Sequence, residues 1–161
     1  MTKPTLAKGL AMALSLAAPP ALADTPEGYY ASGWPIALAE AACDGDEACL
    51  TQLADCGPGA TDCIAGVALC TFSSESDFTF TGACRSDVIT SRHGKALRAT
   101  LPSGEVLTLF LPNQGTAALN GRMAERLSDH CVRTFQDNLS FCARPLTTEA
   151  DFNLWRQETG Q

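Results

Sequence analysis

The sequence predicts an α+β protein: a short, disulfide-laddered helical hairpin lobe at the N-terminus, followed by a small antiparallel β-sheet with a C-terminal helix. Three observations predict this class. Cysteines recur at helical spacing in the first half, apolar and polar residues alternate after residue 78, and two late aromatic residues return to helical spacing. We expect an acidic, Cys-rich helical lobe at 24–75 and a β domain with its C-terminal helix at 76–161, together forming one compact unit.

The first 23 residues have the features of a secretory signal peptide. Two lysines precede an apolar stretch at 9–18, which is too short to cross a bilayer as a helix, and two prolines end it. Ala21 and Ala23 then place small residues where signal peptidase reads them. We therefore expect cleavage after Ala23 and a periplasmic or secreted protein of 138 residues. A buried N-terminal helix is the alternative.

All eight cysteines follow the predicted cleavage site: Cys43, Cys49, Cys56, Cys63, Cys70, Cys84, Cys131 and Cys142. An even number of cysteines in an exported chain predicts four disulfides. The sequence contains no C-x-x-C motif, which argues against a thioredoxin-like dithiol, a zinc ribbon and c-type haem attachment. We therefore expect no metal and no cofactor.

Three short helices are expected in the acidic lobe, at 36–43, 47–56 and 62–70. The first is rich in strong helix formers. Asp46 can cap the second, because its carboxylate accepts hydrogen bonds from the exposed amides of the first turn. The Gly-Pro-Gly sequence at 57–59 ends that helix and makes the connection to the third helix short.

The last two of these helices each carry cysteines seven residues apart, which places each pair on one helix face. In an antiparallel hairpin Cys56 then faces Cys63 near the turn, and Cys49 faces Cys70 at the open end. The spacing resembles the twin-cysteine hairpin of coiled-coil-helix-coiled-coil-helix proteins. Pairing between sequence neighbours, such as Cys43 with Cys49, is the alternative.

Alternation of apolar residues predicts the sheet. The clearest hairpin joins 96–101 to 106–111, and residues 123–130 are expected to form one or two helical turns. A second hairpin at 131–143 places Cys131 opposite Cys142, which predicts a disulfide between them. The remaining cysteines, Cys43 and Cys84, would join the two lobes. The last helix is expected to begin at Thr147 or Thr148, with Phe152 and Trp155 packing against the sheet.

Charge is distributed unevenly along the chain. Residues 24–87 contain eleven acidic residues and one basic residue, a balance of −10. Such a surface repels nucleic acid and anionic membranes and favours a cationic partner. The candidate partner-binding residues are Asp44, Asp46, Glu47, Asp55 and Asp62. A merely solubilising surface is the alternative.

The sequence contains no recognisable catalytic set. Ser128, Asp129 and His130 are adjacent, whereas a catalytic triad needs these residue types to converge from separate elements. The other histidine, His93, lies in a polar turn. Six cations offer an alternative patch for an anionic ligand: Arg92, Lys95, Arg98, Arg122, Arg126 and Arg133.

These features together predict an exported, disulfide-stabilised, non-catalytic binding protein of the bacterial envelope. The cysteine-bearing sheet within 78–142 and its Leu-Pro-Ser-Gly-Glu turn are similar to periplasmic and membrane-bound lysozyme inhibitors of the C type, which implies a cationic cell-wall hydrolase as the partner. The Ser-Gly-x-x-Tyr loop of those inhibitors is missing, since no tyrosine follows Tyr30. A structural or envelope-assembly factor and an unrecognised periplasmic enzyme are the alternatives.

Overall fold

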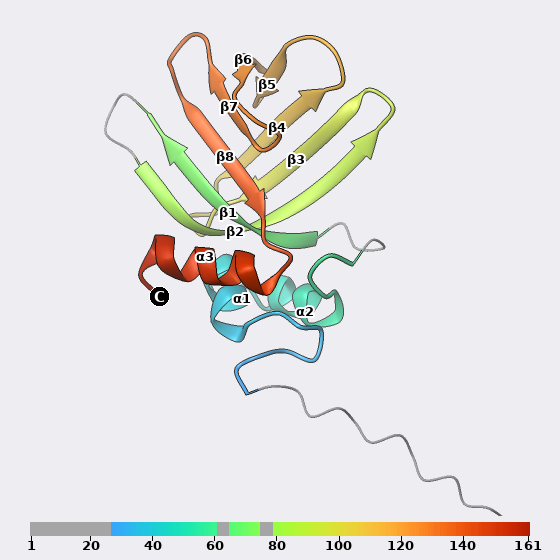
Figure 1. Cartoon of the computed structure of the whole chain (residues 1–161), viewed down its shortest axis with the longest axis vertical. Helices are drawn as coiled ribbons and strands as arrows, with labels where there is room; N and C mark the ends of the chain where they lie inside the picture. Colours follow the sequence, from blue (N-terminus) through green and yellow to red (C-terminus); the bar gives the residue numbers. More distant parts are fainter. Residues whose placement is uncertain (1–26, 61–64, 75–78) are drawn as a thin grey trace, which may run out of the picture.

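The computed structural model describes residues 27–60, 65–74 and 79–161, and within them eight strands form a closed antiparallel barrel (Figure 1). Neighbours in sequence pair with one another, and β1 pairs with β8 to close the barrel. The strands are β1 (Ala65–Ser73), β2 (Thr79–Ser91), β3 (Gly94–Thr100), β4 (Val106–Pro112), β5 (Ala117–Leu119), β6 (Arg122–Arg126), β7 (Cys131–Thr134) and β8 (Ser140–Pro145). The helices α1 (Ile36–Cys43), α2 (Glu47–Asp55) and α3 (Glu149–Thr159) cover the side formed by β1 and β2.

This barrel contradicts the predicted helical hairpin lobe with a small sheet. The difference arises at residues 65–73, which form strand β1. The sequence predicts a helix at 62–70, which covers most of this strand. Cys70 contributes to the barrel interior, whereas Val67 and Leu69 are buried beneath the helices. A strand buried on both faces is a continuous apolar run, and periodicity does not distinguish such a run from a buried helix.

Side chains fill the interior of the barrel. Alternate residues point inward and are buried, such as Leu97 and Ala99 in β3 and Leu109 in β4. The disulfide between Cys70 and Cys84 lies among them and joins β1 to β2. Eight strands enclose a space just wide enough to be filled in this way. Cavities are found at the two ends of the barrel.

A second core lies between the helices and the outer face of β1 and β2. Trp34 is 1% exposed and packs against Phe152 of α3, with ring centroids 5.9 Å apart. Its Nε1 donates a hydrogen bond to the Cys56 carbonyl oxygen, 2.6 Å away. Trp155 is buried in the same cluster, as the spacing of the last helix predicted. The segment before α1 and the three helices therefore share one apolar layer beside the barrel.

The helix ends follow ordinary capping chemistry. At the start of α2 the Asp46 carboxylate accepts hydrogen bonds from the amides of Ala48 (2.9 Å) and Cys49 (3.3 Å). Thr148 and Asp151 form a capping box at the start of α3. These contacts satisfy amides that have no partner within the helix. Among the described residues, no helix has the length and apolar character needed to cross a membrane.

The disulfides of the first half differ from the predicted ladder. Cys43 is bonded to Cys49 and Cys70 to Cys84, so the predicted pairs Cys49–Cys70 and Cys43–Cys84 are wrong. The cause is the misassigned strand. Since β1 is part of the barrel, Cys70 lies in the barrel interior, whereas Cys49 lies at the start of α2. Pairing between sequence neighbours, the alternative for Cys43, is the arrangement observed.

In the second half the predicted hairpin is present. Cys131 and Cys142 are opposite each other on β7 and β8 and are bonded. The helical turns expected at 123–130 are wrong, because strand β6 (Arg122–Arg126) covers the first half of this segment and pairs with β5 and β7. Cys56 is disulfide-bonded, and its predicted partner, Cys63, lies outside the described residues.

Candidate functional site

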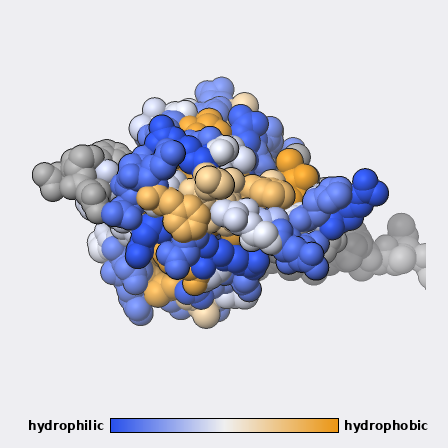
Figure 2. All heavy atoms as spheres, turned by 90° about the horizontal axis from the view of Figure 1, so that it is seen from above, coloured by the Kyte–Doolittle hydropathy of each residue, from blue (hydrophilic) through white to orange (hydrophobic). Residues whose placement is uncertain are grey.

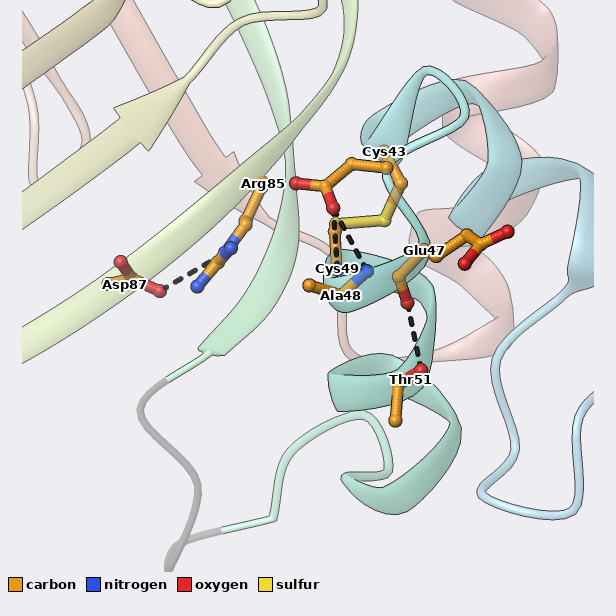
Figure 3. Close-up of a disulfide and its surroundings, with 8 residues drawn as sticks. Cys43, Glu47, Ala48, Cys49, Thr51, Arg85 and Asp87 are labelled. Atoms are coloured by element: carbon orange, nitrogen blue, oxygen red, sulfur yellow. Dashed lines mark hydrogen bonds and ion pairs between the residues drawn. A yellow bond between two sulfur atoms is a disulfide. The ribbon is translucent and has the colours of Figure 1, made fainter.

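A groove of about 220 Å³ lies where the helices meet the barrel. One wall is the disulfide Cys43–Cys49, which ties the end of α1 to the start of α2, and Arg85 of β2 lies beside it (Figure 3). The opposite wall comes from the end of β3 and the β3–β4 connection, mainly Thr100, Leu101 and Pro102. Because Asp44 and Asp46 also line this space, we call it the acidic groove.

The predicted acidic residues occupy different places around α2. Asp44 ends α1 in the left-handed conformation and Asp46 caps α2, so both reach the acidic groove. Glu47 lies in the first turn of α2 and Asp55 is its last residue. These four residues are exposed. Asp62, the fifth candidate, lies outside the described residues.

The acids on this side form no ion pair among the described residues. Among the described residues the ion pairs are Arg85–Asp87, Arg122–Asp137, Arg126–Asp129 and Arg144–Asp151. None of them involves a carboxylate from residues 27–60, although six exposed acids occur there: Glu27, Glu40, Asp44, Asp46, Glu47 and Asp55. Arg85, the cation in the groove, lies 3.7 Å from Asp87 instead. The helical side therefore carries uncompensated negative charge.

One end of the barrel opens into a cavity of about 300 Å³. Its apolar lining residues are Phe72, Leu107, Leu119 and Leu139, and its polar lining residues are Glu105, Asn120, Arg122 and Thr134. The Arg122 guanidinium lies 2.6 Å from the Asp137 carboxylate. The Thr134 hydroxyl donates to that carboxylate and, with Arg122, keeps the pKa of Asp137 below its ordinary value. The cation at this end is therefore already neutralised.

The opposite end of the barrel opens into a more polar cavity of about 260 Å³. Lys95, Asn113, Arg126, Asp129 and His130 line it, together with Leu111 and Pro112. This end thus gathers Lys95 and Arg126, two of the six cations singled out in the sequence, whereas Arg122 lies at the other end.

The residues of the triad type do not form a triad. The Ser128 hydroxyl accepts a hydrogen bond from the backbone amide of His130, 3.2 Å away, which stabilises the β6–β7 turn. Asp129 lies 2.6 Å from the Arg126 guanidinium. His93 is exposed, and its Nε2 accepts a hydrogen bond from Arg92.

Apolar side chains form a row on the outer face of the barrel, away from the helices. In cross-strand register the row contains Ile89, Ala96, Phe110, Ala118 and Met123. Phe135 continues it, since its amide donates to the Met123 carbonyl oxygen. Figure 2, which views the molecule from above, shows hydrophobic residues gathered across this face. The barrel therefore has an acidic side and, opposite it, a partly apolar side.

No family model, curated protein or solved structure matches the chain. Within the described residues, no group of three or more His, Cys, Asp or Glu side chains is arranged to hold a metal ion. The candidate site therefore rests on the groove and its charge.

Proposed function

We propose that the chain is an exported, disulfide-stabilised, non-catalytic binding protein of the bacterial envelope whose partner is a cationic protein. The observation that carries this proposal is the charge on the helical side. Exposed carboxylates gather there without ion pairs, while Asp87, Asp129, Asp137 and Asp151 are each matched by an arginine. Uncompensated charge of one sign steers a partner of the opposite sign.

The acidic groove offers a binding place for one cationic side chain beside these carboxylates. Its volume of about 220 Å³ is enough for one long side chain, and Asp44 and Asp46 stand at its edge. A lysine or arginine of the partner can lay its aliphatic stem against Leu101 and Pro102 with its charge beside the two carboxylates. The disulfide Cys43–Cys49 fixes the carboxylates in place, because it joins the two helix ends that carry them.

Export is supported by the disulfides. Bonds that persist between cysteines are typical of oxidising compartments outside the cytoplasm. Residues 1–26, which include the predicted signal peptide, lie outside the described residues.

The test uses the mature protein as bait in a periplasmic extract, with lysozyme as a defined cationic probe. Charge reversal at Asp44→Lys, Glu47→Lys and Asp55→Lys together is expected to weaken binding about tenfold or more at low salt, and high salt is expected to remove most of it. The control reverses an exposed acid on the barrel away from the groove, Glu125→Lys on β6, and is expected to bind normally. Equal binding by the helical variant, or an equal loss in the control, contradicts the proposal.

A further inference from the structure

The polar end of the barrel is independent of the acidic groove and has features of a ligand site. Its cavity of about 260 Å³ is bounded by strands β3, β4 and β6 and by the turn that leads into β7. The space is large enough for several water molecules. A small organic molecule therefore fits without displacing the core.

Lys95 provides the charge in this cavity. It lies on the same face of β3 as Leu97 and Ala99, which point into the barrel, and it pairs with Leu111 on β4. Its side chain is half-buried and forms no ion pair among the described residues. A partly desolvated ammonium group without a counterion is unfavourable, so the position favours an anion.

His130 lies at the same cavity and has an unused ring nitrogen. Its Nδ1 is buried and has no hydrogen-bond partner among the described residues. Burial, followed by the charge of Lys95, lowers the pKa of His130, and Arg144 adds to this effect while Asp129 opposes it. The imidazole is therefore neutral in the free protein at neutral pH. When protonated it gains a second N–H donor.

The remaining charges around the cavity cancel in pairs. Arg126 lies 2.6 Å from Asp129, and Arg144 on β8 lies 3.2 Å from Asp151. The β4 side contributes no charge, because Leu111 and Pro112 are apolar and Asn113 is a neutral amide. One positive charge, that of Lys95, is left over.

We propose that this end of the barrel binds a small monoanionic carboxylate. The carboxylate pairs with the Lys95 ammonium, and its negative charge beside His130 raises the pKa of that imidazole, so that binding takes up a proton. The aliphatic part of the ligand packs on Leu111 and Pro112. In the free protein at neutral pH the site has one excess positive charge, which pairs with one carboxylate, and a space of this size takes a ligand with a short carbon chain.

The chain offers clean probes for the test. In the mature protein Lys95 is the only lysine, and His93 is the only other histidine. In NMR titrations propionate is expected to raise the pKa of His130 and to leave the ring resonances of His93 in place. Affinity for propionate is expected to rise as the pH falls through the pKa of His130 in the free protein, because binding takes up a proton.

Variants separate a specific site from general charge effects. Lys95→Met is expected to weaken propionate binding about 10–100-fold, the range for a lost charge-assisted contact. Arg98→Met, which removes an exposed cation from the same strand, is the matched control and is expected to have no effect. An unchanged circular dichroism spectrum and melting temperature verify that the Lys95 variant is folded.

Three results overturn the proposal. The first is an equal shift of both histidines, and the second is equal weakening by the two variants, since either result indicates charge screening. The third is binding of inorganic phosphate in preference to propionate, because it contradicts the carboxylate assignment. Propionamide, the neutral analogue, is expected not to bind, and its binding with similar affinity contradicts the role of the Lys95 charge.

Discussion

Trp34 links the segment before α1 to two helices, and its replacement tests how the helical layer is held on the barrel. Trp34→Ala removes a side chain that is 1% exposed, which costs about 3–5 kcal/mol for the lost burial and cavity. Trp34→Phe keeps much of the volume but removes the Nε1 donor from the Cys56 carbonyl, which lies 2.6 Å away. The loss of this partly buried hydrogen bond costs about 0.5–1.5 kcal/mol. The expected order of stability is therefore wild type, Trp34→Phe, Trp34→Ala.

The assay is thermal unfolding of the mature protein with its disulfides intact, followed by circular dichroism. In a chain of this length, 1 kcal/mol corresponds to about 3–5 °C in Tm, so the alanine variant is expected to melt at least about 10 °C lower. Phe135→Ala serves as the aromatic control, because Phe135 is 61% exposed and its loss is expected to change stability by about 0.5 kcal/mol or less. A Trp34→Ala loss below about 1 kcal/mol, or an equal loss in the control, would refute the packing argument.

Two further predictions concern stability. Removing the barrel disulfide with Cys70→Ala and Cys84→Ala is expected to lower the free energy of unfolding by about 3 kcal/mol, and removing Cys43–Cys49 in the same way by about 2 kcal/mol. The first loss is larger because Cys70 and Cys84 are 14 residues apart and close a longer loop than Cys43 and Cys49, which are six apart. Urea unfolding measures both losses, and the reverse order would contradict this dependence on loop length. The pKa of Asp151 is lowered: burial opposes this, but hydrogen bonds from Thr148 and Thr147 and the charge of Arg144 outweigh it. Its folded pKa is thus below its unfolded value, so its contribution to stability is present at neutral pH and is lost as the pH falls below about 4 through the folded pKa. Asp151→Asn is expected to lower stability at pH 7 and to reduce the acid dependence of unfolding, and an unchanged pH profile would contradict this role.

Local patterns predicted much of the secondary structure. The helix expected at 36–43 is α1, and the hairpin of 96–101 with 106–111 corresponds to β3 and β4. These segments succeed because helix propensity or alternating burial acts within a few residues. Segment 65–73 fails because both of its faces are buried, one by the barrel and one by the helices. Closure of the barrel depends on pairing between β1 and β8, which no local pattern encodes.

The candidate sites were predictable to different degrees. Asp46 was identified as a cap, and the structure places it in the acidic groove with Asp44. Arg85 and Leu101 were missed, because they reach the groove only through the barrel register. The inward direction of Lys95 could have been found, since it shares the period-two face of Leu97 in β3.

The Cys43–Cys49 disulfide forms one wall of the acidic groove, and strand β1 closes the barrel by pairing with β8. Peptide mapping of the exported, non-reduced protein by mass spectrometry tests both. We expect cross-linked peptides that contain Cys43 with Cys49 and Cys70 with Cys84, and an N-terminus at Asp24. A peptide joining Cys49 to Cys70 would contradict the barrel and the groove, and would restore the helical hairpin.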